Sequence, residues 1–214
     1  MRPEFAAAVD PVFQGAIEFL DRIEHGSADS AEIEHAKILG LFDRADTVLG
    51  ASRQWQLARY ALAVWIDEML LTLPWTGSTW WRNHILEMKL FQSRICNERF
   101  FELAKQASAL SCRDALEVFY NCVLLGFRGM YALAEAERTV EHNEDWPRTI
   151  DQWLDRTSRM IDVVPIQANA DGTHRPIPGA PPLTGRHQVV WWSVGALCLA
   201  LINVALYQFL HAHE

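Results

Sequence analysis

Apolar side chains between residues 10 and 162 recur every three or four positions, and alternation of apolar and polar positions is scarce. The first spacing places apolar side chains on one face of a helix, whereas alternation is typical of a half-buried strand. The pattern therefore predicts an all-α head. A different pattern, an unbroken apolar run, occupies residues 189–210.

Capping residues, glycines and prolines divide the head into seven expected helices. The first is expected to open at Pro11, with Phe13, Ile17 and Leu20 as its apolar stripe. The expected N-caps of later helices are Ser30, Ser52, Asn97 and Ser111. The expected segments are 10–26, 30–50, 52–73, 80–91, 97 onward, 111–126 and 145–161.

The apolar run at residues 189–210 is long enough to cross a membrane. Its 22 residues carry no formal charge. A helix rises about 1.5 Å per residue, so the run spans roughly 33 Å against a bilayer core of about 30 Å. Trp191 and Trp192 lie near one end, where the membrane interface favours aromatic rings. We predict a transmembrane helix from Val189 to Leu210, with Asn203 available for helix–helix contact; a buried core helix is the alternative.

The residues around this run predict its topology. Residues 163–188 contain five prolines and three glycines, which favour a semi-extended linker over a helix. Arg186 precedes the run and no Lys or Arg follows it, so the positive-inside rule places residues 1–162 in the cytoplasm and residues 211–214 across the membrane. The start, MRPEFAAAVDPVFQ, carries Asp and Pro where a signal peptide has an apolar core. The sequence thus predicts a tail-anchored protein.

The net charge of −8 lies entirely in residues 1–162, which hold 17 basic and 25 acidic side chains. Nucleic-acid binding needs a basic face, so this class of function is not expected. The four cysteines lack the CxxC spacing of a zinc site, and we expect free thiols.

Two adjacent carboxylates, Asp67 and Glu68, stand in the otherwise apolar segment YALAVWIDEMLLTLPW. A helix that is apolar nearly all round is buried on several faces, so these carboxylates need partners. Positions three and four residues away offer no cation, and the partner must come from another helix. Arg128, between Gly126 and Gly129, is the expected partner. Acid–base catalysis by the pair is the less favoured alternative, because consecutive helical residues point about 100° apart.

A helical metalloprotein is the alternative from another class of function. Glu32-x-x-His35 has the carboxylate–histidine spacing of di-iron bundles, and His84-x-x-Glu87 has it in reverse order. Such bundles need the motif twice with two further glutamates, so solvated helix faces are the favoured interpretation. No metalloprotease, dinucleotide-binding, nucleophile-elbow or P-loop motif is present, and no cofactor is expected.

Several ordered motifs resemble the DotU/TssL (IcmH-like) family of bacterial secretion systems: RYALAVWIDEMLLTLPW, WWRNHILEMKLF, ERFFELA and DALEVFYNCVLLGFRGMY. The resemblance covers about residues 10–162, and the linker and C-terminal span also fit it. The residues that carry it, and that it implies as structural or interaction sites, are Asp67, Glu68, Trp75, Phe100, Phe101, Glu117, Tyr120, Gly126, Phe127, Arg128, Gly129 and Tyr131.

The resemblance implies a cytoplasmic head of two packed helical bundles in a hook-like shape, anchored in the bacterial inner membrane with a periplasmic C-terminus. It implies a non-enzymatic part of a type VI secretion apparatus that joins a TssM/IcmF-like membrane protein to baseplate components of the TssK and TssE type. Homodimerisation is also implied. An equivalent subunit of a type IVB system is the alternative within the family.

The sequence departs from the family pattern at two places. Many members have a Gly-Gly pair where this chain has Ile95-Cys96-Asn97, so the loop there is expected to differ. Some members carry a peptidoglycan-binding domain after the span, whereas only HAHE follows here, and no such domain is expected. We expect a groove between the two halves of the head, lined by exposed aromatic side chains, to serve as the docking face.

Overall fold

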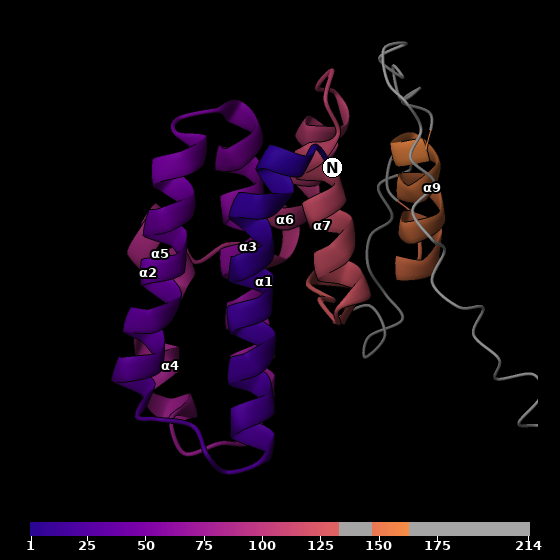
Figure 1. Cartoon of the computed structure of the whole chain (residues 1–214). Helices are drawn as coiled ribbons and strands as arrows, with labels where there is room; N and C mark the ends of the chain where they lie inside the picture. The colour runs from indigo at the N-terminus through magenta and orange to yellow at the C-terminus, as the bar shows by residue number, and fades with distance from the viewer. Residues whose placement is uncertain (133–146, 163–214) are drawn as a thin grey trace, which may run out of the picture. The chain divides into compact units, whose positions relative to one another are not determined.

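A computed structural model describes residues 1–132 and 147–162, apart from the side chains of residues 96–98 and 162. These ranges are helical with connecting turns and contain no strand, which confirms the all-α prediction (Figure 1). The helices are α1 Pro3–Glu24, α2 Ala31–Leu49, α3 Arg53–Thr72, α4 Ser78–Asn83, α5 Leu86–Phe91, α6 Cys96–Ser108, α7 Asp114–Leu124 and α9 Ile150–Asp162.

All described residues belong to one compact unit, Met1–Ile166. The predicted linker at 163–188, the span at 189–210 with Val189, Trp191, Trp192, Asn203 and Leu210, and the tail at 211–214 lie outside the described residues. Within the described part of the chain, no helix is long and apolar enough to cross a membrane.

Helix α3 is the centre of the described fold. It contacts α1, α2, α4 and α5, and it also contacts α6 and α7. Its sequence explains this position, because the segment from Tyr60 to Asp67 is buried at every residue. A helix that is apolar on all sides must be covered on all sides. Helices α1 and α2 pack together, as do α6 and α7, and α9 packs on α7.

The N-terminal helix differs from its expected form. Helix α1 begins at Pro3, eight residues before the expected start, and contains Pro11 in its interior. Pro11 removes one backbone hydrogen bond, but Val9, Val12 and Phe13 around it are buried, and this packing holds the helix through the proline. The stripe prediction was wrong for Ile17, which is 45% exposed.

Helices α2 and α3 begin and end close to their predicted bounds, and Ser52 Oγ accepts a hydrogen bond from the Trp55 amide at 3.3 Å, as a capping residue should. Ser30 occupies the N-cap position of α2 without a side-chain capping bond.

Three later boundaries differ from their predictions. The single helix expected at 80–91 is two short helices, because the chain turns at His84 and Ile85 to bring α5 against α3. Helix α7 begins at Asp114, so Ser111 is not its N-cap, and α6 begins at Cys96, one residue before its expected cap. Helix α9 begins at Ile150, three residues after Pro147.

Candidate interaction site around Asp67 and Glu68

Asp67 is buried, and all the hydrogen-bond donors on its carboxylate come from the α4–α5 segment. Oδ1 accepts from the Trp81 indole N–H at 2.9 Å and from the Leu86 amide at 2.9 Å, and Oδ2 accepts from the Glu87 amide at 2.8 Å. The carboxylate therefore supplies the cap that α5 lacks locally. Burial raises the pKa of Asp67 to about 6, against the opposing effect of its three donors.

A second buried carboxylate, Glu87, extends this network. Its Oε1 accepts from the Tyr60 hydroxyl at 2.8 Å and from the Ile95 amide at 3.1 Å. Asp67 on α3 binds α5, and Glu87 on α5 binds back to α3. These reciprocal contacts fix the α4–α5 segment on the central helix.

Glu68 binds a different segment, the turn that follows α7. Its carboxylate accepts from the Arg128 amide at 2.6 Å and from the Gly129 amide at 3.0 Å. The divergence follows from helix geometry, since consecutive side chains point about 100° apart. Glu68 is only half-buried, and this partial burial raises its pKa.

The turn at residues 125–129 presents these amides to Glu68. Gly126 and Gly129 have φ angles of 110° and 52°, which side-chain-bearing residues rarely adopt. A Cβ on Gly129 would also lie 2.8 Å from the Phe127 ring. The pairing predicted between the carboxylates and Arg128 was wrong in its chemistry: the Arg128 guanidinium lies near the Val123 and Phe127 carbonyls, at 3.4 and 3.3 Å. Glu68 accepts from the backbone N–H of residue 128, and the charge of the guanidinium only partly offsets the rise in the Glu68 pKa that burial causes.

Four phenylalanines of the motifs, Phe100, Phe101, Phe119 and Phe127, form part of the core. Phe100, Phe101 and Phe127 are fully buried, and the Phe100 ring lies 4.0 Å from the Phe127 ring and 4.8 Å from Phe119. These rings therefore do not line the expected docking groove, which stays a prediction. Tyr131 is also buried, and its hydroxyl donates to the Pro147 carbonyl at 2.9 Å. Burial raises the pKa of Tyr131 to about 12.

The remaining motif residues lie apart from the carboxylate pair. The half-buried Trp75 donates its indole N–H to the Leu70 carbonyl at 3.0 Å and packs edge-on against Phe19. Tyr120 is half-buried on α7, and Glu117 on the same helix contacts the amino group of Met1.

An ion pair between the N-terminus of the chain and the start of α7 was missed by sequence reasoning. Arg2 donates through its backbone N–H and its Nε to buried Asp114, at 2.8 and 2.6 Å. The hydrogen bonds from Arg2 keep the pKa of Asp114 below its ordinary value although burial alone would raise it. The sequence predicted Ser111 as the start of this helix, and no linear pattern connects Asp114 to a residue 112 positions away.

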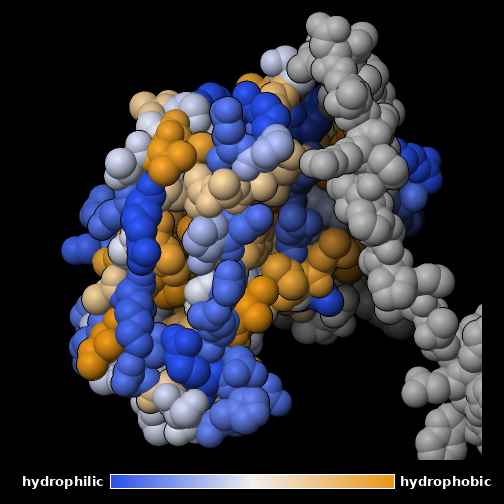
Figure 2. All heavy atoms as spheres, viewed as in Figure 1, coloured by the Kyte–Doolittle hydropathy of each residue, from blue (hydrophilic) through white to orange (hydrophobic). Residues whose placement is uncertain are grey.

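Exposed leucines flank the Glu68 turn. Leu124 and Leu125 are 57% and 42% exposed directly before Gly126, and Leu73 at the end of α3 is 38% exposed. Figure 2 shows hydrophobic residues reaching the surface on the face that carries α1 and α7. Leu124 and Leu125 directly precede the turn that binds Glu68, and exposed apolar side chains next to charged groups occur in protein-binding surfaces. We call Leu73, Leu124, Leu125, Glu68 and Arg128 the turn surface.

The two histidines of the metalloprotein alternative meet the same tryptophan. The His84 ring stacks on Trp80 at 4.0 Å, and buried His35 packs edge-on against Trp80 at 5.4 Å. Their expected carboxylate partners lie elsewhere: Glu32 is exposed, and Glu87 is bound to Tyr60. Within residues 1–132 and 147–162, no group of three or more His, Cys, Asp or Glu could hold a metal ion.

Both the sequence and the fold of this chain match known proteins. The family described as "Type VI secretion system protein DotU" matches residues 4–213. Among solved structures, the chain is similar to the cytoplasmic domain of TssL from Acinetobacter baumannii, with 25% identity and a TM-score of 0.56, over 72% of this chain and 96% of that one. No curated protein matches.

Proposed function

The chain belongs to the DotU family of type VI secretion system proteins, and we propose that it is a structural, non-enzymatic subunit of the membrane complex of that system. The observation that carries the proposal is the family match over residues 4–213, which includes the helical head and the predicted linker and span. The family description favours a type VI apparatus over the type IVB alternative.

The proposed mechanism is mechanical. A single span at residues 189–210 would hold the protein in the bacterial inner membrane, with the head in the cytoplasm and the last four residues in the periplasm. Its apolar length and the position of Arg186 support this topology. The head would link a TssM/IcmF-like membrane protein to baseplate components of the TssK and TssE type, and the protein would form a homodimer.

The arrangement of the head as two bundles in a hook-like shape is part of the same proposal. Two separate sets of packed helices support it, since α1 packs on α2 while α6 and α9 pack on α7, and all meet at or next to α3. Asp67 would hold the α4–α5 segment, of which α4 contacts α2, and Glu68 would hold the turn after α7, so that the two carboxylates would tie both sets to α3.

The turn surface is the proposed contact for a baseplate component. Its exposed leucines offer apolar area, and Glu68 and Arg128 offer charged groups. Partners are expected to bury such mixed surfaces, in which a few apolar side chains contribute most of the affinity.

Site-specific photocrosslinking in the native bacterium tests the proposal. A photoreactive residue at Leu124 should capture a TssK- or TssE-like protein, identified by mass spectrometry. The matched control places the same residue at Val48, an apolar side chain that is 68% exposed on α2. Equal capture from both positions would reject the turn surface as the contact. Absence of any secretion component from the full-length protein purified out of native membranes would reject the function.

A further inference from the structure

A buried histidine lies where helices α2 and α4 meet. His35 on α2 is 8% exposed, and its ring lies edge-on to the rings of Trp80 and Trp81 on α4, at centroid distances of 5.4 and 5.0 Å. Trp81 is fully buried and donates its indole N–H to Asp67 of α3. The His35 ring therefore contacts the same tryptophan that the Asp67 network uses to hold α4.

One nitrogen of the His35 ring has no partner. Among the described residues, the buried side-chain nitrogens without a hydrogen-bond partner are His35 Nε2, Arg59 Nε and Arg113 Nε. Arg59 and Arg113 each bind an oxygen through another nitrogen of the guanidinium, and an arginine stays charged in proteins. Of the three side chains, His35 is the one whose charge changes near neutral pH.

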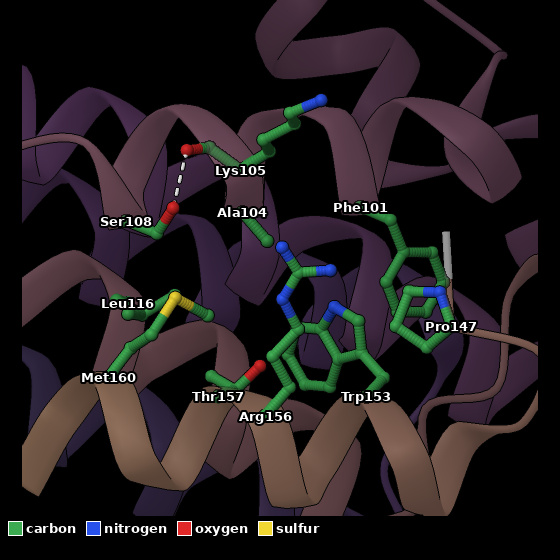
Figure 3. Close-up of a pocket in the computed structure, with 10 residues that line it drawn as sticks. All are labelled: Phe101, Ala104, Lys105, Ser108, Leu116, Pro147, Trp153, Arg156, Thr157 and Met160. Carbon is green, nitrogen blue, oxygen red and sulfur yellow. Dashed lines mark hydrogen bonds between the residues drawn. The ribbon is translucent and has the colours of Figure 1, made fainter. Parts of the chain in front are cut away.

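The hollow between α6 and α9 shows a more usual arrangement. Its wall is mainly apolar, with Trp153 and Met160 on α9, and the Ser108 hydroxyl at its edge donates to the Lys105 carbonyl at 2.8 Å (Figure 3). Most buried polar atoms in proteins are hydrogen-bonded in this way, and each exception calls for an explanation. The buried Nε2 of His35 is such an exception.

The surroundings of Nε2 favour a neutral ring. A proton on Nε2 would create a charged N–H group with no acceptor, whereas a neutral ring can leave a lone pair there. Burial is the main cause that lowers the pKa of His35 below its ordinary value of 6.5, and a contact with the backbone of His84 opposes this effect. The charges of His84 and Lys89 lower the pKa of His35 further.

The carboxylates of the neighbouring elements are already bound to other groups. Asp67 on α3 accepts from the α4–α5 segment, and Glu87 on α5 accepts from α3 and from the chain after α5. Glu34, the neighbour of His35 on α2, accepts from Arg22 of α1 at 2.7 Å. None of these carboxylates bonds to Nε2, so the charge of a protonated His35 ring would stay unbalanced.

We propose that His35 is a pH-sensitive contact between α2 and α4, and that uptake of a proton at Nε2 favours separation of α4 from α2. Separation would let water reach Nε2 and hydrate the charged ring. Helix α4 has six residues, and a short segment can open without unfolding of the rest of the chain. The stabilisation from the neutral ring is fully present above about pH 6.5 and is lost as the pH falls below this value.

Asp67 responds to pH in the opposite direction. Its pKa of about 6 is raised by burial, so protonation of Asp67 favours the closed position of α4 as the pH falls. The effects of Asp67 and His35 therefore oppose each other as the pH falls from 7.5 to 5.5. A substitution at residue 35 separates the two effects, because Asp67 is the same in both proteins.

Hydrogen–deuterium exchange of the full-length chain in detergent, followed by mass spectrometry, tests the proposal. The measured quantity is the exchange rate of peptides that cover residues 78–84, divided by the intrinsic exchange rate at each pH. His35→Phe keeps an aromatic ring against both tryptophans and cannot take up a proton. The ratio of the native rate to the His35→Phe rate should rise about fivefold from pH 7.5 to pH 5.5, within the limit of about tenfold for a proton bound only in the open form.

Three controls make the result specific. His35→Gln is also neutral at every pH and replaces His35→Phe as the reference if the larger ring disturbs the packing. His25→Gln removes an exposed histidine at the end of α1 and should keep the native response. Peptides that cover α7 should show a ratio that does not change with pH.

Three results would overturn the proposal. A ratio for residues 78–84 that stays flat with pH would show that α4 does not open with protonation of His35. A ratio that falls with the pH would show that the tryptophan rings stabilise the charged ring. An equal rise in the α7 peptides would show that the whole head unfolds, so that α4 is not released by itself.

Discussion

Asp67 and Glu68 are neighbours in sequence, and both find their partners among backbone amides of other segments. Their surroundings differ. Asp67 is enclosed, with its three donors on α4 and α5, whereas Glu68 is half-open to solvent and binds the turn at 125–129. Asp67 therefore has a structural role on one side of α3, whereas Glu68, on the other side, stands where it can form contacts.

The two sites differ in whether water can replace the carboxylate as a hydrogen-bond acceptor. Water can reach the amide of Arg128 if Glu68 is removed, because Arg128 is exposed, whereas Gly129 is buried. Water cannot readily reach the donors around Asp67, because Trp81 and Leu86 are both fully buried. The energetic cost of an unpaired donor depends on this access.

Replacement of Asp67 by alanine is expected to have the largest effect. It leaves three buried N–H groups without an acceptor, each costing about 1–3 kcal/mol, and local relaxation should recover part of this. We expect a loss of about 4 kcal/mol in the free energy of unfolding at pH 7, measured by urea titration with tryptophan fluorescence. A loss below about 1 kcal/mol would mean that water enters the site and that the two carboxylates are equivalent.

The pH dependence of stability should also distinguish the two sites. The folded pKa of Asp67, about 6, lies above its ordinary value of about 3.9, so the folded state favours the protonated form. The resulting stabilisation is fully present below about pH 4 and is lost as the pH rises through about 6, by an amount on the order of 2–3 kcal/mol.

The measurement is the difference in unfolding free energy between the native chain and Asp67→Ala, taken from pH 4 to pH 7.5. This difference should shrink as the pH rises. The lowered pKa values of Glu34 and Asp114 affect both proteins below about pH 4 and cancel. Of the groups facing Asp67, Glu87 is the titratable one that influences its pKa. A difference that is flat with pH would show that Asp67 stays charged throughout the range.

Glu68→Ala is the direct counterpart on the exposed side. The amide of exposed Arg128 gains access to water, and only the amide of buried Gly129 is left without an acceptor, so we expect a loss of about 1–2 kcal/mol in the same urea titration. Glu68→Gln keeps one acceptor oxygen and should lose less than half of that. A loss equal to that of Asp67→Ala would show that the turn is sealed from solvent.

Much of this arrangement could be predicted from the sequence. The nearly continuous apolar surface of α3 predicted a helix buried on all sides, and its two carboxylates predicted partners from other helices. The expected N-cap Ser52 and the expected end at residue 73 both lie next to the observed bounds of α3. These inferences succeeded because composition and period report directly on burial and on helix termini.

The identity of the partners could not be predicted. Every residue offers a backbone N–H, so the sequence does not show which amides a fold leaves unpaired at the start of α5 or in the turn before Gly129. The prediction chose the Arg128 side chain because a sequence shows which side chains are present but does not show which backbone N–H groups lack a partner. Pro11 was misassigned for a related reason: proline at a helix start and proline inside a packed helix look alike until the tertiary contacts are known.

Arg128→Gln should have the smallest effect on the free energy of unfolding. It tests whether the fold needs the charge of Arg128 or only its backbone N–H. The Arg128 side chain is exposed, its guanidinium contacts are long at 3.3 and 3.4 Å, and its backbone N–H to Glu68 remains after the substitution. We expect a change below about 0.5 kcal/mol in the unfolding free energy, as for other exposed side chains.

The charge exchange Asp67→Arg with Arg128→Asp should recover none of the stability that Asp67→Arg loses, because the two side chains do not pair. Recovery above about 1 kcal/mol would restore the ion pair that the sequence predicted. If stability is unchanged while crosslinking from Leu124 falls in the Arg128→Gln variant, the guanidinium serves the partner and not the fold.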